Sequence, residues 1–206
     1  MIPPVPLLPT AAPWLDLAGL AVFATSGALA AAQRKQTLVT LSFFALITGV
    51  GGGTVRDLLI GAPVFWVRDG KVAALCLIVA MLIWMTPRRW WSGAALDWFD
   101  AVGLAAYAAY GAAKALKYGV PPVPAAVMGV VSACVGGIIR DMLAGEPSIL
   151  MRPELYVTAA ALASASFVTL TALGLDATTA GLIAATAGFA LRAAAIRWKL
   201  ALPAYR

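Results

Sequence analysis

The sequence predicts an all-α membrane protein with seven transmembrane helices, arranged as two inverted three-helix repeats plus a seventh helix. Two observations support this prediction. Of the 206 residues, 62% are hydrophobic and only 12% are charged, whereas a soluble domain carries about 25% charged residues. The chain also repeats itself, because positions 50–66 read VGGGTVRDLLIGAPVFW and positions 134–150 read CVGGIIRDMLAGEPSIL. We therefore expect a single transmembrane domain built from two related halves.

Seven apolar segments approach the length of about 20 residues that a transmembrane helix needs. We place repeat one at about 14–87, repeat two at about 96–174 and the seventh helix at about 177–198. The six helices of the repeats are expected at about 14–33, 37–61, 71–87, 96–117, 123–145 and 154–174. These long Ala- and Leu-rich runs lack the alternation of barrel strands. A helix also satisfies its backbone polar groups within one segment, as lipid requires.

Residues of one repeat recur in the other at a constant spacing of 84 positions. Gly52, Gly53, Arg56, Asp57, Gly61, Pro63 and Arg68 recur as Gly136, Gly137, Arg140, Asp141, Gly145, Pro147 and Arg152, and Trp14 and Asp16 recur as Trp98 and Asp100. Each repeat holds three helices, so the second repeat enters the membrane from the opposite side. Inverted repeats of this kind are common in transporters, whose sites lie between the repeats near the bilayer midplane. The seventh helix has no counterpart and is expected to pack outside the six-helix core.

The positions of Lys and Arg predict the orientation in the membrane. One side would carry Arg34, Lys35, Arg88, Arg89, Arg140, Arg152, Arg192, Arg197, Lys199 and Arg206, and the other Arg56, Arg68, Lys71, Lys114 and Lys117. Because cytoplasmic loops carry the excess of positive charge, we expect the C-terminus in the cytoplasm and the N-terminus outside. The N-terminal segment has no basic residue near its start, unlike a signal peptide, so the first helix is expected to stay in the mature protein. The net charge of +6 fits contact with anionic lipid, and nothing predicts a nucleic-acid partner.

Glycines interrupt the second and fifth helices at equivalent places. Gly51, Gly52 and Gly53 are consecutive, and Gly136 and Gly137 follow Val135 in the second copy. A glycine inside a helix costs about 1 kcal/mol relative to Ala, and such residues permit a kink. One interpretation is a break that turns backbone carbonyls toward a cavity. The alternative is close packing of helices through small residues.

Four charged residues follow these glycines at a depth where charge is costly. Arg56, Asp57, Arg140 and Asp141 are expected to face a cavity or a partner. Since adjacent residues on a helix point about 100° apart, we expect Arg56 to face Asp141 and Arg140 to face Asp57 across the inverted repeats. These pairs would tie the repeats together and could also control opening.

Other polar residues offer two interpretations each. Lys114 and Lys117 lie on one helix face, where they could extend to the membrane surface or act as a gating or lipid-binding element. Thr25, Ser26 and Ser132 could offer oxygen atoms to an ion, although such hydroxyls more often bond their own helix.

Enzyme chemistry is not predicted. The chain has no histidine, the usual general base and metal ligand near neutral pH. Cys76 and Cys134 fall in different helices without metal-ligand spacing. A phosphate-binding loop of the GxxxxGK[ST] type is absent from the sequence. We expect no catalytic residue, no metal site and no cofactor.

The segments GGGTVRDLLIG and VGGIIRDMLAG, within two three-helix repeats and a seventh helix, resemble prokaryotic members of the trimeric intracellular cation channel family. The resemblance implies a homotrimer in which each subunit conducts monovalent cations, mainly potassium, beside kinked second and fifth helices. It implies that Gly51, Gly52, Gly53, Gly136 and Gly137 are the kink residues and that Arg56, Asp57, Arg140 and Asp141 lie next to the pore. It also implies a bacterial inner membrane, with potassium or sodium ions and lipid as partners.

The same sequences also resemble a glycine transporter family, so a secondary transporter of a small amino acid is the alternative function. A channel needs a continuous water path with weak multi-site binding, whereas a carrier needs an occluded site and alternating access. Inverted repeats suit both. A purely structural or lipid-organising protein would leave the buried charges unexplained. Two arginines in a cation path would repel the ion, so we expect them to fix the helices around the pore.

Overall fold

A computed structural model of the chain describes residues 13–67, 69–91, 94–151 and 153–203. In this part of the chain, seven α-helices and two short 3₁₀ turns form the structure. The β pairing of these residues consists of one isolated bridge. Arg68, Arg152 and Arg206, which entered the prediction of orientation or the repeat, lie outside the described residues. So do the side chains of Trp14, Asp16 and Arg88.

The seven helices follow the predicted order and nearly the predicted limits. They are α1 (Pro13–Gln33), α2 (Leu38–Leu59), α3 (Gly70–Met85), α4 (Ala95–Lys117), α5 (Pro122–Ala144), α6 (Val157–Ala172) and α7 (Ala177–Trp198). The 3₁₀ turns are η1 (Arg88–Trp90) and η2 (Ile149–Met151). The largest difference is the start of α6, which we expected near residue 154. The chain there forms an antiparallel bridge between Glu154 and Ala201 instead of a helical turn.

Short polar side chains and a glycine set several helix ends. The Thr37 hydroxyl accepts a hydrogen bond from the backbone N–H of Thr40 at the start of α2, and Asp69 caps α3 in the same way. Such caps satisfy backbone donors that the first turn of a helix leaves free. Gly145 ends α5 with φ of +67°, a left-handed conformation that glycine adopts without a steric penalty.

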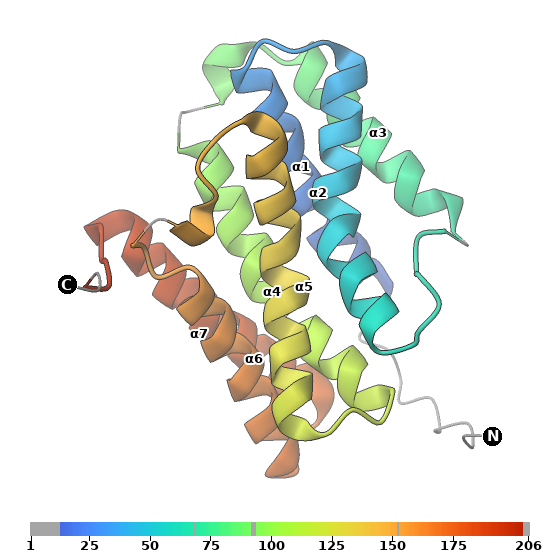
Figure 1. Cartoon of the computed structure of the whole chain (residues 1–206), viewed down its shortest axis with the longest axis vertical. Helices are drawn as coiled ribbons and strands as arrows, with labels where there is room; N and C mark the ends of the chain where they lie inside the picture. Colours follow the sequence, from blue (N-terminus) through green and yellow to red (C-terminus); the bar gives the residue numbers. More distant parts are fainter. Residues whose placement is uncertain (1–12, 68, 92–93, 152, 204–206) are drawn as a thin grey trace.

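The two repeats run in opposite directions, as predicted. Following the colours of Figure 1, α1 rises, α2 descends and α3 rises, whereas α4 descends, α5 rises and α6 descends. Between the repeats, α2 packs against α5 and α1 packs against α4. The helix α7 packs on α4 and α6 at the periphery of this core, also as predicted.

Two glycines bring α2 and α5 into backbone contact at symmetry-related points. A Cβ atom added at Gly52 would lie 2.1 Å from the carbonyl oxygen of Ser132, and one added at Gly136 would lie 2.4 Å from that of Thr48. The two contacts are equivalent under the 84-residue offset of the repeats, because Gly52 corresponds to Gly136 and Thr48 to Ser132. The inverted two-fold relation of the repeats is therefore visible at the level of single atoms.

The predicted break at the glycines is wrong. Both α2 and α5 are continuous helices through Gly51–Gly53 and through Gly136 and Gly137. The glycines instead remove the side chains that would keep the two helices apart, which is the alternative interpretation of close packing. A kink or bend at Gly51–Gly53 or at Gly136 and Gly137 within these continuous helices stays a prediction.

Glycines also allow close contact where α1 crosses α4. Gly19 faces the ring of Tyr107, and its counterpart Gly103 faces the ring of Phe23. The two rings meet edge to face, with centroids 5.2 Å apart. Such aromatic pairs contribute about 0.5–1.5 kcal/mol beyond the area they bury.

The outer surface is suited to lipid. Among the described helices, those at 38–59, 122–144 and 177–198 are long and apolar enough to cross a membrane on their own. The helices α3 and α6 have 16 residues each, about 24 Å at 1.5 Å per residue. Large apolar side chains of α3, such as Ile78, Leu82 and Met85, are exposed, as expected for a face covered by hydrocarbon.

We predict that Gly52→Ala destabilises the protein by about 1–3 kcal/mol, since an added methyl group forces a shift of tightly packed backbone. Gly70→Ala is the matched control, because a Cβ at Gly70 meets nothing within 4 Å and its φ is not in the left-handed region. Thermal unfolding of both purified variants in detergent measures the difference. Equal midpoints for the two variants would contradict this account of the α2–α5 contact.

Candidate functional site

The first motif forms a buried cluster of two cations around one carboxylate. Arg56 donates from Nε and Nη2 to Oδ1 of Asp57, at 2.9 and 2.7 Å. Lys114 of α4 reaches the same carboxylate, with Nζ 2.8 Å from Oδ1 and 2.9 Å from Oδ2. The backbone N–H of Phe65 donates to Oδ2 of Asp57 at 3.2 Å. Asp57 therefore joins α2, α4 and the segment that follows α2.

The second motif repeats this geometry with the opposite balance of charge. Arg140 donates from Nε to Oδ1 of Asp141 at 2.9 Å, and the backbone N–H of Ile149 donates to Oδ2 at 2.8 Å. A second carboxylate, Asp100 of α4, accepts from Nη1 of Arg140 at 2.5 Å. One guanidinium thus faces two carboxylates here, whereas two cations face one carboxylate in the first motif.

The predicted pairing of charges across the repeats is wrong. Arg56 pairs with Asp57 and Arg140 with Asp141, each within its own motif. The long arginine side chain turns back along the helix and offers two N–H groups to one carboxylate oxygen. The arginine side chain is therefore long enough to reach the adjacent residue despite the 100° between their positions on the helix.

Besides the Lys114–Asp57 ion pair, serine hydroxyls and a tyrosine ring connect the two repeats at the arginines. Arg56 donates to the hydroxyl of Ser132 at 3.4 Å, and its guanidinium lies 5.3 Å from the ring centre of Tyr110. Arg140 donates to the hydroxyl of Ser26 at 3.1 Å. Ser26 and Tyr110 are counterparts in the two repeats. Each arginine is therefore held by both halves of the molecule.

These contacts favour the second interpretation of three hydroxyls, in which they bond to their own helices, and a role toward an ion stays a prediction. Thr25, Ser26 and Ser132 donate to the carbonyl oxygens of Ala21, Phe23 and Met128 in their own helices. Ser26 and Ser132 also accept a hydrogen bond from an arginine, which leaves each oxygen at most one lone pair. They act as ties between helices.

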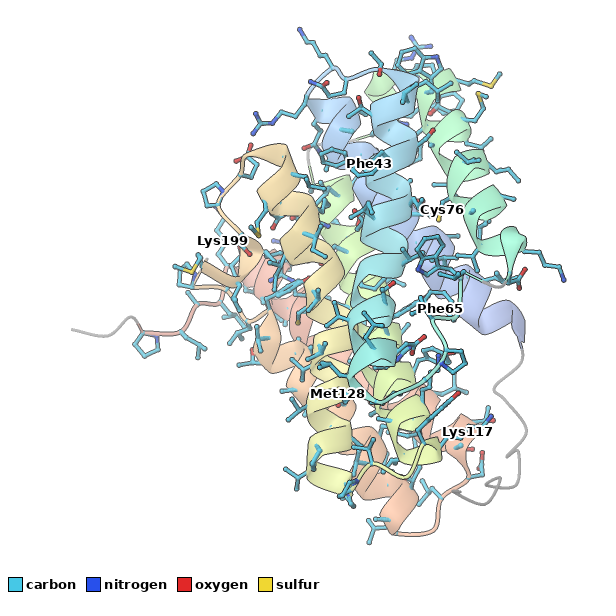
Figure 2. All side chains as sticks on the ribbon, turned by 45° about the vertical axis from the view of Figure 1, so that its right-hand side comes forward. Phe43, Phe65, Cys76, Lys117, Met128 and Lys199 are labelled. Atoms are coloured by element: carbon cyan, nitrogen blue, oxygen red, sulfur yellow. The ribbon has the colours of Figure 1, made fainter. Side chains whose placement is uncertain are left out.

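The two lysines of α4 lie in different surroundings. Lys114 lies against Asp57 and 5.7 Å from the ring centre of Phe65, with 14% of its side chain exposed. Its predicted extension to the membrane surface is therefore wrong, because a buried carboxylate attracts it inward. Lys117, one turn further along, is half-buried, and Figure 2 shows it near the lower end of the molecule.

Two substitutions between the repeats make the surroundings of the two motifs different. The counterpart of Lys114 is Ala30, and the counterpart of Phe65 is Ile149. Lys114 lies against Asp57 and the ring of Phe65. Around Asp141, the smaller side chains leave a cavity of about 240 Å³. The inverted symmetry is thus broken by side-chain volume and charge.

This cavity is lined by polar groups from both repeats. Its walls include Asp97, Arg140 and Asp141 from repeat two and Gln33 and Arg34 from repeat one. Arg34 pairs with Glu146 at the rim, and both side chains are about half exposed. The cavity lies at the end of the molecule where α1 ends and α4 begins, the upper end in Figure 1. Arg140 and Asp141 of the second motif are among its described lining residues.

Sequence reasoning missed two groups that complete the site. Asp100 was noted only as the counterpart of Asp16, although a recurring acid inside an apolar helix is a signal for a buried partner. Tyr156 is buried next to Gly137, and a Cβ atom at Gly137 would lie 2.7 Å from its hydroxyl oxygen. No sequence pattern pointed to Tyr156, which follows a 3₁₀ turn.

A family model described as a glycine transporter matches this chain twice, over residues 13–88 and 97–172. These two matches coincide with the two repeats. The UPF0126 membrane protein of Vibrio cholerae is 39% identical over 197 residues, which cover 93% of this chain and 81% of that protein. The UPF0126 inner membrane protein YadS of Escherichia coli is 37% identical over 199 residues, covering 93% of this chain and 95% of that protein. The chain therefore belongs to the family of this model.

Solved structures refine this assignment. The trimeric intracellular cation (TRIC) channel orthologue from Rhodobacter sphaeroides has a TM-score of 0.85 and 41% identity, covering 91% of this chain and 97% of that one. Another prokaryotic TRIC channel has a TM-score of 0.83 and 25% identity, covering 92% and 97%. The chain is a prokaryotic member of the TRIC family.

The more distant TRIC proteins share the fold alone. A TRIC channel from C. elegans superposes with a TM-score of 0.62 at 18% identity. The difference between Lys114 and its counterpart Ala30 is a matter of side chains in this sequence and does not follow from the shared fold.

We predict that Asp57→Asn destabilises this TRIC protein more than Asp141→Asn. Loss of the Asp57 charge leaves Arg56 and Lys114 without a carboxylate, and breaking a buried ion pair costs about 3–5 kcal/mol. Loss of the Asp141 charge leaves Asp100 in contact with Arg140. Glu146→Gln is the control, because an exposed ion pair contributes about 0–1 kcal/mol.

Thermal unfolding of the three purified variants in the same detergent tests the order. The account expects the largest loss for Asp57→Asn and the smallest for Glu146→Gln. A larger loss for Asp141→Asn than for Asp57→Asn would show that the charge balance of the two motifs is not as described.

Proposed function

We propose that the protein is a monovalent cation channel, mainly for potassium, with a separate pore in each subunit of a homotrimer. The observation that carries this proposal is the unequal filling of the two ends of the site. A polar cavity reaches the second motif from one end, while Lys114 lies against the carboxylate of the first motif at the other. The solved relatives, described as trimeric cation channels, support the same function.

The proposed pore runs between the inverted repeats along α2 and α5. These helices are in backbone contact at Gly52 and Gly136, so a small bend at Gly51–Gly53 or Gly136 and Gly137 would change the width of the path. Glycine lowers the cost of such a bend because its backbone has the widest conformational freedom. Inverted-repeat transporters also place their sites at this interface.

Lys114 is the proposed gate. In the closed state it occupies the carboxylate that a passing cation would meet, and its ammonium group repels cations. Its departure from Asp57 would expose a negative group at the end of the path. A charge that moves through the membrane field gains about 2.3 kcal/mol per 100 mV over the full span, so this gate would respond to voltage.

The arginines have a supporting role in this proposal. Arg56 and Arg140 are each 1% exposed and bonded to an aspartate and a serine. A guanidinium directly in the path would repel the ion. Both arginines would instead hold the aspartates and the facing helices in place while Lys114 moves. Lys117 lies further along α4 and would contribute to the charge at that end.

The orientation follows from the positive-inside rule. The end of the molecule with Arg34, Lys35, Arg89, Arg197 and Lys199 would face the cytoplasm, and the N-terminus would lie outside. The membrane would be the inner membrane of a bacterium, in keeping with the description of the relative in Escherichia coli. The polar cavity at the second motif would then open toward the cytoplasm, and Lys114 would close the outer end.

A carrier for a small amino acid is the second candidate, since the matching family model is described as a glycine transporter. A cavity that opens at one end and is closed at the other also fits one state of alternating access. A carrier would bind the carboxylate of glycine in this cavity, where Arg34 and Arg140 are the cations among the described lining residues. The two functions differ in turnover and in saturation by substrate.

Single-channel recording in planar bilayers separates the two functions. We expect the purified protein to give discrete unitary current steps in potassium chloride and no saturable uptake of labelled glycine into proteoliposomes. Lys114→Met should raise the open probability and weaken its voltage dependence, because the repelling charge is gone. Lys117→Met is the matched control on the same helix and should leave the open probability near that of the wild type.

Glycine uptake without unitary currents would establish the carrier instead. Unitary currents with equal gating in Lys114→Met and Lys117→Met would keep the channel but reject Lys114 as the gate. Both variants are first compared with the wild type in detergent by mass, so that loss of the trimer is not mistaken for an effect on gating.

A further inference from the structure

A second cavity, of about 290 Å³, lies near the polar one but is built differently. It is bounded by the end of α1, the start of α2, the end of α3 and the residue after η1, where Trp91 forms one wall. These segments lie together at the upper end of the molecule in Figure 1. Among the described lining residues, the two cavities share only Gln33. The proposed function does not use this second cavity.

The cavity combines an apolar floor with a polar rim. Leu29, Leu41 and Ile83 form the floor, and all three are buried in the α1–α3 core. Lys35 and Thr86 contribute to the rim. A ligand that fits must therefore carry a polar group and an apolar continuation.

The charge of the rim selects an anion. Lys35 is the charged residue among the described lining residues, and none of them is Asp or Glu. The neighbouring Arg34 faces Glu146 and the polar cavity instead. An exposed lysine without an acid in the same cavity favours a phosphate or a carboxylate.

Tryptophans place this cavity at the level of the lipid headgroups. Trp84 and Trp91 line it, and Nε1 of Trp91 donates to the hydroxyl of Thr86 at 2.8 Å. Tryptophan is enriched where the hydrocarbon of a membrane meets water. Trp90 beside them is 66% exposed, as expected for a side chain that inserts at this level.

An apolar stripe leads from the cavity along α3. Leu77, Met81 and Trp84 follow the i, i+4, i+7 spacing of one helix face and are 55%, 45% and 51% exposed. Trp84 belongs to the cavity wall, so the stripe is continuous with it. The stripe points toward the hydrocarbon core. It offers a track of the kind that an acyl chain follows.

We propose that this cavity binds the headgroup of an anionic phospholipid, with Lys35 against the phosphate and an acyl chain along the Leu77–Met81–Trp84 stripe. Its volume lies near the lower limit of about 300 Å³ for ligand pockets, which suits a headgroup and glycerol but not a whole lipid. The inference does not depend on whether the protein conducts cations.

The test compares two lipids with the same acyl chains, phosphatidylglycerol and phosphatidylcholine, added to the purified full-length protein in detergent. Native mass spectrometry counts the bound lipids. We expect the wild type to bind phosphatidylglycerol more tightly. Lys35→Gln should weaken this binding about fivefold, because one lysine near an anionic lipid contributes about 1 kcal/mol. Lys71→Gln, an exposed lysine at the other end of α3, is the matched control and should bind like the wild type.

A second variant keeps the charge and fills the space. Ala32 is half-buried in the cavity wall, and Ala32→Leu should weaken phosphatidylglycerol binding with Lys35 intact. Equal binding of the two lipids by the wild type, or equal loss in Lys35→Gln and Lys71→Gln, would overturn the proposal. So would full competition by inorganic phosphate alone, which would indicate a free-anion site. A changed oligomeric mass in Ala32→Leu would identify the cavity as a subunit contact instead.

Discussion

The burial of charge in an apolar interior is the constraint on which this structure depends. Four buried groups, Arg56, Asp57, Arg140 and Asp141, sit at membrane depth with at most 6% of their surface exposed. An isolated charge there costs several kcal/mol, so each arginine is bound to the carboxylate beside it. Each aspartate then has a second oxygen free to accept from a backbone N–H eight residues later. The motif therefore fixes both a helix and the loop that follows it.

Close contact between α2 and α5 makes this pairing useful to the fold. Without side chains at Gly52 and Gly136, the helices approach until backbone meets backbone. The facing serines, Ser26 and Ser132, then come within hydrogen-bond reach of the arginines of the other repeat. The ion pairs remove the cost of buried charge, and the glycines allow the helices to approach. The two features act together to hold the inverted repeats in register.

Most of the architecture could be predicted from the sequence, and the reason is physical. Apolar length, the 84-residue repeat and the odd number of helices in each repeat specify seven helices with inverted halves. The start of α6 was misplaced because the bridge between Glu154 and Ala201 is a long-range contact. Helix periodicity carries no information about such contacts.

The partners inside the site were harder to predict. Helical geometry suggested that Arg56 would face Asp141, but an arginine has enough rotatable bonds to reach the next residue. The glycines allowed either a break or close packing, and only the position of the facing carbonyls decides between them. The role of Lys114 depends on Phe65, which lies outside the helices and turns back toward α2 in Figure 2.

The broken symmetry of the repeats links the fold to the proposed function. A perfectly symmetrical pair would be open or closed at both ends alike. In this chain, Lys114 stands where the other repeat has Ala30, and Phe65 stands where it has Ile149. These two differences add a cation and an aromatic ring at one end only. In the proposed channel, one end of the path is then accessible and Lys114 is the gate at the other.

The central claim is that Lys114 and Asp57 interact directly and that this contact keeps the path closed. A double-mutant cycle of Asp57→Asn and Lys114→Met, measured on the equilibrium between open and closed states in bilayer recordings, tests it most directly. The account predicts a coupling energy of about 0.5–3 kcal/mol, the range for residues in contact, and almost none for the cycle of Asp57→Asn with Lys117→Met. Additive effects of Asp57→Asn and Lys114→Met would contradict it.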